Sequence, residues 1–129
     1  MSAVAHPVIQ RAIDEVVATF GDDHVEVSPA DGGATWVAVT GRDVGEQWNM
    51  STTAITVKVL STYPTTPVYP FYLPAGFAKK VGGNPGNLAA ATVDGRSFVQ
   101  LSLNKPTSDS PETLATRIVG AIAWLRGQA

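Results

Sequence analysis

The chain has 129 residues, of which 44% are hydrophobic and 16% charged, and its formal net charge is −2. These values fit one globular domain over residues 1–129 and exclude a basic surface for nucleic acid. No apolar run reaches the roughly 20 residues of a membrane span, and the N-terminus lacks the pattern of a signal peptide, so we expect a cytoplasmic protein that binds neither nucleic acid nor membrane.

The absence of cysteine limits the chemistry of this chain. It excludes disulfides, thiolate metal sites and cysteine nucleophiles together. The two histidines, His6 and His24, lack the spacing of metal ligands. We therefore expect no metal site and no cofactor.

The first predicted element is an amphipathic helix over Pro7–Phe20. Its apolar residues recur at helical spacing, and charged residues fall on the opposite side. Pro7 suits the first helical position, and Gly21 suits the position just beyond the end.

Strand patterns follow the helix. Residues Val25–Val27 and Ala34–Val39 predict a hairpin around a turn rich in Pro, Asp and Gly. In Trp48–Leu60 apolar and polar residues alternate, which predicts a half-buried antiparallel strand. We expect Thr53–Leu60 to be central, with the hairpin on one side and Tyr69–Leu73 on the other.

The segment Ser61–Pro74 is dense in proline and aromatic residues. Prolines at this density exclude a helix and a central strand, because each one lacks a backbone N–H. The segment is therefore predicted to be extended and to lie at a sheet edge. Its prolines are Pro64, Pro67, Pro70 and Pro74, and its aromatic residues are Tyr63, Tyr69, Phe71 and Tyr72.

Periodicity is absent from Gly76 to Gly95, and the composition of Val81–Asn87 predicts a long loop. Alternation returns in Ser97–Leu103, which predicts a short strand. A last helix is predicted to begin at Ser110-Pro111-Glu112 and to end at Arg126-Gly127. Its expected core face is Leu114, Ile118, Ala121, Ile122 and Leu125.

This order of elements resembles the ubiquitin-conjugating-enzyme-like (UBC-like) superfamily, which includes RWD domains. The run from Val57 through Tyr63-Pro64 to Pro70-Phe71 is similar to the family's strand followed by a proline motif. Residues Gly95–Leu103, then Pro111 and the helix to Leu125, resemble the stretch that carries the catalytic cysteine. The resemblance implies an α+β fold with an N-terminal helix, a four-stranded antiparallel meander, a proline-rich edge, a long loop and a C-terminal helix packed on the sheet.

The chain departs from active members of that superfamily at the residues that carry chemistry. It has no thiolate, and Asn84-Pro85-Gly86-Asn87 lacks the histidine of the family's His-Pro-Asn motif. An ordinary turn is the favoured explanation of these four residues, because Asn, Pro and Gly are the residues that turns need. No histidine lies near Ser51, Ser97 or Ser102 in sequence to act as a base. We therefore predict that the chain is not an enzyme.

The hypothesis that follows is a non-catalytic UBC-like interaction module. The likeness to small bacterial UBC-like proteins implies a bacterial ubiquitin-like conjugation or defence system, with an activating-enzyme-like, ligase-like or ubiquitin-like protein as partner. The alternatives are a structural or oligomerising subunit and a hydrolase with non-cysteine chemistry, and the oligomeric state stays open. The residues predicted to bind the partner are Tyr69, Tyr72, Lys79, Lys80, Asn84 and Asn87.

Incubation with an activating enzyme, ATP and a ubiquitin-like protein should yield no thioester on this chain, because a thioester requires a thiol. Non-reducing electrophoresis, with and without hydroxylamine, measures this. A hydroxylamine-sensitive adduct that accumulates within minutes would contradict the prediction that the chain is not an enzyme.

Overall fold

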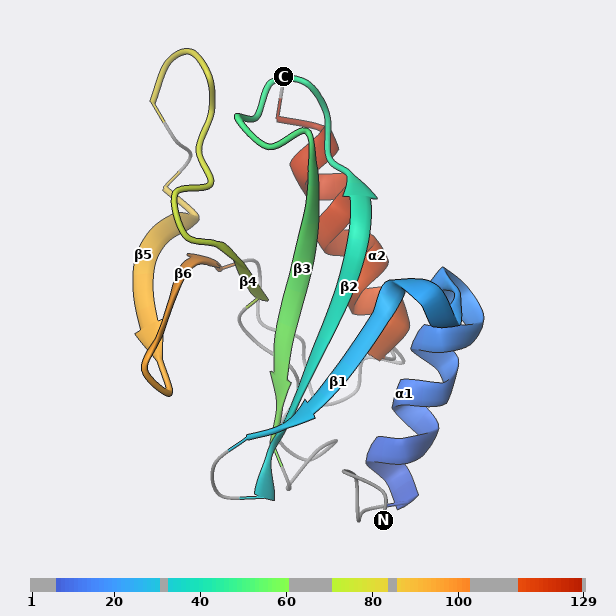
Figure 1. The fold of residues 1–129 in the computed structure, drawn as a ribbon. Coiled ribbons are helices and arrows are strands. Elements are labelled where there is room, and N and C mark those ends of the chain that lie inside the picture. The colour runs from blue at the N-terminus through green and yellow to red at the C-terminus, as the bar shows by residue number, and fades with distance from the viewer. Residues whose placement is uncertain (1–6, 31–32, 61–70, 84–85, 103–113, 129) are drawn as a thin grey trace.

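The structure, a computed structural model, describes residues 7–30, 33–60, 71–83, 86–102 and 114–128. Its elements combine helices with an antiparallel sheet, which confirms the predicted α+β class (Figure 1). In chain order they are α1 (Pro7–Phe20), the short 3-10 helix η1 (Asp22–His24), β1 (Val25–Pro29), β2 (Thr35–Asp43), β3 (Thr52–Val59), β4 (Phe71–Pro74), β5 (Leu88–Val93), β6 (Arg96–Leu101) and α2 (Leu114–Arg126).

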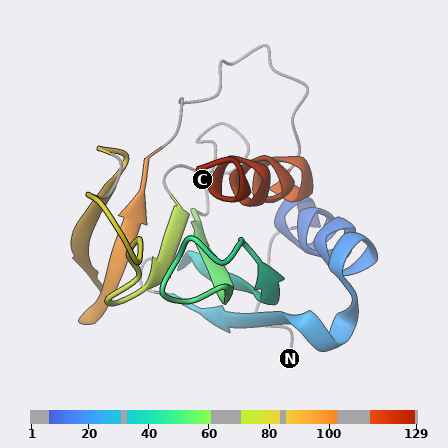
Figure 2. The same ribbon diagram turned by 90° about the horizontal axis from the view of Figure 1, so that it is seen from above.

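The sheet has six strands in the order β1-β2-β3-β4-β6-β5, and each neighbouring pair is antiparallel. Helices α1 and α2 lie on the same side of it (Figure 2). Strand β3 lies between β2 and β4, which confirms that this segment is central. The predicted four-stranded meander of a UBC-like fold is wrong, because β5 and β6 form an additional hairpin.

Strand β5 lies within the stretch predicted to be a loop. Its sequence, Leu-Ala-Ala-Ala-Thr-Val, does not alternate apolar with polar residues and so gives no strand pattern. The hairpin is set by Asp94-Gly95, where both residues have positive φ, 52° and 76°. An Asp-Gly pair in this conformation matches the right-handed twist of the two strands that it joins.

The predicted edge position of the proline-rich segment is also wrong for the part that the structure describes. Strand β4 pairs with β3 through Thr56 and Tyr72, and with β6 along its whole length. Phe71, Tyr72 and Leu73 each retain an N–H for these ladders, and Pro74 comes only at the end. The sheet edges are β1 and β5. The other residues of that segment, 61–70, lie outside the described residues.

Several boundaries differ from those predicted. Strand β1 continues to Pro29 and β2 to Asp43, and β3 begins at Thr52, so that Trp48 belongs to the preceding loop. The predicted start of the last helix at Ser110 and the predicted strand end at Leu103 lie outside the described residues.

The main core lies between the helices and the sheet. Ile55, Val57 and Val59 of β3 are fully buried there together with Ile118 and Leu125 of α2, as predicted. Alternation along β3 explains this arrangement, because every second side chain points towards the helices. Helix α1 adds Ile9, Ala12, Ile13 and Val16 to the same cluster.

The C-terminus of α2 is fixed by the loop between β2 and β3. The indole Nε1 of Trp48, which is fully buried, donates to the carbonyl oxygen of Leu125 at 2.9 Å. Gln47 Nε2 donates to the carbonyl oxygens of Leu125 and Arg126, at 2.9 and 3.2 Å. The last carbonyls of a helix lack the usual intrahelical partner, so these donors, together with Gln128 N at 3.3 Å from the Leu125 oxygen, satisfy them.

The same loop is joined to the segment that follows β4. The ring of Trp48 stacks on Phe77 with centroids 4.8 Å apart. Asn49 N donates to the Ala78 carbonyl, and Ala78 N donates to Asn49 Oδ1. Trp48 thus connects two loops of the sheet to one helix.

Replacing Trp48 with Phe should lower the free energy of unfolding by about 2–3 kcal/mol, since a hydrogen bond to a buried carbonyl is lost and the ring becomes smaller. Denaturant unfolding measures the change. The matched control is Trp124→Phe, because Trp124 is only partly buried and no hydrogen bond from its indole to the described residues exists. Equal losses in the two variants would contradict the role given to the Trp48 indole.

Candidate functional site

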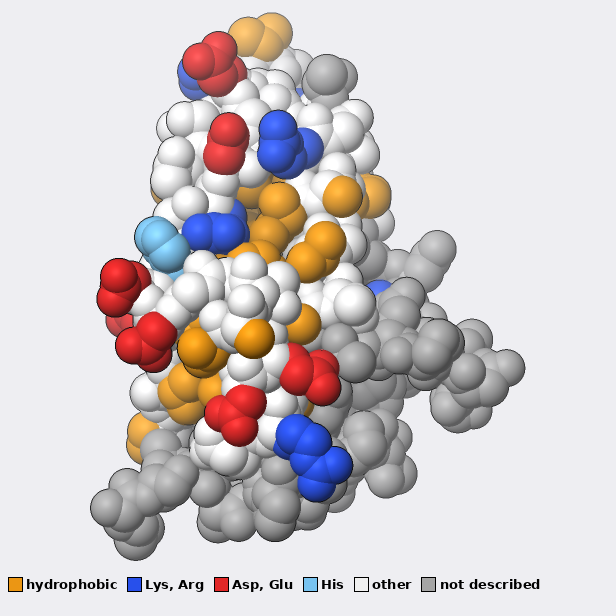
Figure 3. Space-filling view, turned by 90° about the vertical axis from the view of Figure 1, so that its right-hand side faces the viewer, with side chains coloured by type: hydrophobic (Ala, Val, Ile, Leu, Met, Phe, Trp, Pro, Cys, Tyr) orange, Lys and Arg blue, Asp and Glu red, His pale blue; other side chains and the backbone are white. Residues whose placement is uncertain are grey.

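A groove lies where the end of α1, the end of β2 and the outer side of α2 meet. It encloses about 480 Å³ and is lined by Phe20, Gly41, Arg42, Asp43, Val119, Ile122, Ala123 and Arg126. Figure 3 views this side of the molecule and shows hydrophobic side chains gathered between basic ones. The groove therefore combines an apolar floor with charged groups at its margin.

The wall contributed by β2 depends on Gly41. The pairing of β2 with β3 is irregular between Val39 and Arg42, and Gly41 has a φ of 67°. A Cβ at this position would also lie 3.2 Å from the His24 ring. Glycine meets both conditions, and the bulge directs the chain so that Arg42 and Asp43 reach the groove.

Arg42 is held in place by two contacts. Its Nε donates to the Thr40 carbonyl oxygen at 3.0 Å, and its guanidinium carbon lies 5.3 Å from the centroid of the Phe20 ring. A guanidinium has five N–H donors, so four are not used by the Thr40 contact. Arg42 is therefore fixed and still able to bind a carboxylate.

The two other charged residues of the groove differ in their contacts. Asp43 Oδ1 accepts from Gly45 N at 3.0 Å. Arg126 is exposed at the end of α2, and its side chain makes no hydrogen bond or ion pair with the described residues. Two guanidinium groups and one carboxylate give the margin a net charge of +1 on a chain whose net charge is −2.

The groove was not predicted from the sequence, although α2 carries a signal of it. Val119, Ile122 and Ala123 adjoin the buried residues of this helix, so its apolar arc is wider than one buried stripe requires. Val119 is 45% exposed. Ile122 was predicted to be a core residue and is only partly buried against the core, as is Phe20.

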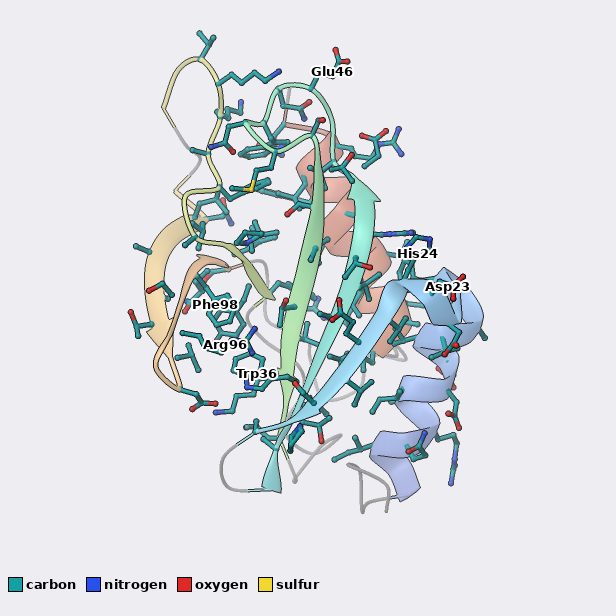
Figure 4. All side chains as sticks on the ribbon, viewed as in Figure 1. Asp23, His24, Trp36, Glu46, Arg96 and Phe98 are labelled. Atoms are coloured by element: carbon teal, nitrogen blue, oxygen red, sulfur yellow. The ribbon has the colours of Figure 1, made fainter. Side chains whose placement is uncertain are left out.

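A second feature lies on the opposite face of the sheet. Trp36, Tyr72 and Phe98, from β2, β4 and β6, form a separate buried cluster with ring centroids 5.1–5.8 Å apart. Arg96 covers it, since its guanidinium lies 5.0 Å from the rings of both Trp36 and Phe98. Figure 4 shows Trp36, Arg96 and Phe98 close together. Because Thr56 and Tyr72 form the one residue pair between β3 and β4 within the described residues, this cluster helps to hold the two halves of the sheet together.

An ion pair lies beside these rings. Lys58 Nζ is 3.0 Å from Asp94 Oδ2 and 5.7 Å from the Trp36 ring centroid. Burial raises the pKa of the Tyr72 phenol above 10.0; Lys58 opposes this effect and Asp94 adds to it. Tyr72 therefore stays protonated in the folded protein at a pH where an exposed tyrosine begins to ionise.

The structure does not bring together the predicted partner-binding residues that it describes. Tyr72 is buried in the aromatic cluster, whereas Lys79 and Lys80 lie beside the loop that carries Trp48. Asn87 uses its side-chain Nδ2 to donate to the Ser102 carbonyl oxygen at 2.6 Å. Tyr69 and Asn84 lie outside the described residues. A role of these six residues in partner binding stays a prediction.

The described titratable residues are dispersed. His24 and Asp23 lie on one side of the molecule and Glu46 at one end (Figure 4). The Ser102 hydroxyl accepts from Gln100 Nε2 at 3.2 Å, and His24 does not contact it. Within the ranges that the structure describes, no three residues of the types His, Cys, Asp and Glu are placed to hold a metal ion.

Comparison with known proteins gives no relative from which a function could be transferred. The chain matches no family model, no curated protein and no solved structure. Among the described residues, no helix is long and apolar enough to cross a bilayer.

Stability should fall as the pH rises above about 10, because the unfolded chain ionises Tyr72 before the folded protein does. When the pKa of a group is raised by folding, its contribution to the free energy of unfolding is fully present below the pKa of the unfolded chain. That contribution is lost as the pH rises through the pKa of the folded protein. Tyr72→Phe should therefore have a shallower decline in unfolding midpoint between about pH 9 and 11. An unchanged decline in this variant would contradict the assignment.

Proposed function

We propose that this chain is a protein-interaction domain that binds a short, acidic, amphipathic segment of a partner in the groove between α1, β2 and α2. The observation that carries this proposal is an exposed apolar floor beside two guanidinium groups, of which Arg42 is fixed by its contacts with Thr40 and Phe20. The bound segment is defined by its apolar and acidic residues.

The apolar floor supports an apolar anchor in the partner. Val119, Ile122 and Ala123 lie on two successive turns of α2, and Phe20 of α1 lines the groove with them. Covering such a surface removes it from water and is favourable by roughly 25 cal/mol for each Å² buried. A volume of about 480 Å³ accommodates a few side chains.

The margin supports an acidic partner. Arg42 and Arg126 can each bind a carboxylate through two parallel N–H donors, a geometry that lysine does not offer. Asp43 already accepts from a backbone N–H, and its charge would repel a carboxylate that approached from its side. The groove therefore favours a segment whose acidic residues flank its apolar ones.

Nucleic acid fits this surface poorly. Of the described residues that line the groove, two are basic and one is acidic, and the whole chain is acidic. A nucleic-acid site needs a wider basic field to contact successive phosphates.

The proposal is tested with a fluorescein-labelled peptide of about 12 residues in which Leu recurs at helical spacing among Glu residues. Fluorescence anisotropy should give a dissociation constant in the micromolar range, and a peptide with Lys in place of each Glu should not bind. Arg126→Glu should weaken binding by about tenfold, or about 1.4 kcal/mol.

Arg11→Glu is the matched control, since it makes the same change of charge at an exposed position of α1 that does not line the groove. It should alter the dissociation constant by less than about twofold, an effect of screened charge alone. Equal weakening by the two substitutions, or binding of neither peptide, would contradict the proposal.

A further inference from the structure

Strand β5 presents an open sheet edge, and its outward-facing groups follow from the hydrogen-bond pattern. Ser102 N donates to the Asn87 carbonyl oxygen, so Asn87 and Ser102 stand at a hydrogen-bonded position at the end of the β5–β6 ladder. Such pairs alternate along an antiparallel ladder. The N–H and C=O groups of Leu88, Ala90 and Thr92 therefore point away from β6.

These groups are accessible. Ala90 and Thr92 are exposed, and β5 is the terminal strand of the sheet. The turn and loop hydrogen bonds of the described residues do not use the backbone groups of Leu88, Ala90 or Thr92. No residue from Leu88 to Val93 is charged or a proline, so the usual protections of a sheet edge are missing here.

The opposite edge of the sheet, strand β1, has fewer outward backbone N–H groups that are free to donate. Ala30 N donates to the Ala34 carbonyl oxygen. By the same alternation, the backbone groups of β1 that point away from β2 belong to Val25, Val27 and Pro29. Pro29 has no N–H, and the N–H of Val25 donates to the Asp22 carbonyl oxygen. Only Val27 retains an outward N–H, and the charged Glu26 lies beside it on β1.

We propose that two copies of this chain pair through their β5 strands, antiparallel across a twofold axis at Ala90. In this register Ala90 lies opposite Ala90 of the second copy, and Leu88 lies opposite Thr92. The outward groups then form about six backbone hydrogen bonds, two for each of the three facing pairs. The pairing joins the two sheets edge to edge.

Two properties of the chain favour a second copy as the occupant. The edge is complementary to itself, since an uncharged strand places no like charges opposite one another. A twofold contact also uses up the β5 edge of both copies, and the protected β1 edges do not extend the assembly. The result is a closed dimer. It is independent of the groove, because no residue of β5 lines that groove.

The test is the mass of the purified full chain in sedimentation equilibrium over a concentration series. The wild-type chain should approach twice the mass of one chain. Ala90→Lys and Ala90→Asp should each raise the dissociation constant of the dimer at least about tenfold, because like charges then face each other. An equimolar mixture of the two variants should dimerise again through opposite charges, which a folding defect would not permit.

Val27→Lys is the matched control on the other edge, where it adds the same charge at an exposed residue. It should leave the dimer unchanged, as should Arg126→Glu in the groove. A wild-type chain that remains monomeric up to about 1 mM would overturn self-pairing. A dimer that withstands both Ala90 substitutions would overturn it too, since another surface would then form the contact.

Discussion

The indole N–H of Trp48 and the carbonyl oxygen of Leu125 form a fully buried hydrogen bond between residues 77 positions apart in the chain. With Gln47 Nε2 and Gln128 N, the indole satisfies the Leu125 carbonyl oxygen at the end of α2. Through the stacking of Trp48 on Phe77, it also positions the segment that follows β4. Because Arg126 directly follows Leu125, the same bond sets where one charged margin of the groove lies.

The two faces of the sheet are stabilised by different means. Aliphatic residues fill the side that the helices cover, whereas the other side has three aromatic rings covered by the cation of Arg96. The second arrangement suits a sheet whose halves, in the part of the chain that the structure describes, share one residue pair between β3 and β4. Large rings span a separation that smaller side chains would leave empty, and an arginine above them keeps its charge near water while its guanidinium contacts the rings.

The parts of the fold with strong periodicity were predictable. Helix α1, strand β3 and the core face of α2 follow from residues spaced at 3.6 or at two, and Ile55, Val57 and Leu125 lie where those patterns place them. Strand β5 was missed because a run of alanines has no alternation, although Asp94-Gly95 is a hairpin signal. Without β5, the strand predicted at Ser97–Leu103 had no hairpin partner, and the four-stranded meander implied by the UBC-like resemblance placed the sheet edge at the wrong segment.

The groove could not be predicted, because its residues come from three separate segments. Phe20, Arg42 and Arg126 are brought together only by the packing of α1, β2 and α2, and no local pattern records this proximity. Arg42 also depends on a bulge at Gly41, where a single glycine in a strand gives a weak signal. Packing of distant segments forms such a site, whereas the buried face of one helix or strand follows from regular spacing in the sequence.

The claim that the groove is the binding surface is tested most directly by nuclear magnetic resonance of the ¹⁵N-labelled chain during titration with the unlabelled acidic amphipathic peptide. The amide signals of Gly41, Arg42 and Ala123 should shift with peptide concentration, whereas those of Lys79, Lys80 and Asn87 should not. Absence of shifts at the groove, or largest shifts at Lys79, Lys80 and Asn87, would contradict the account.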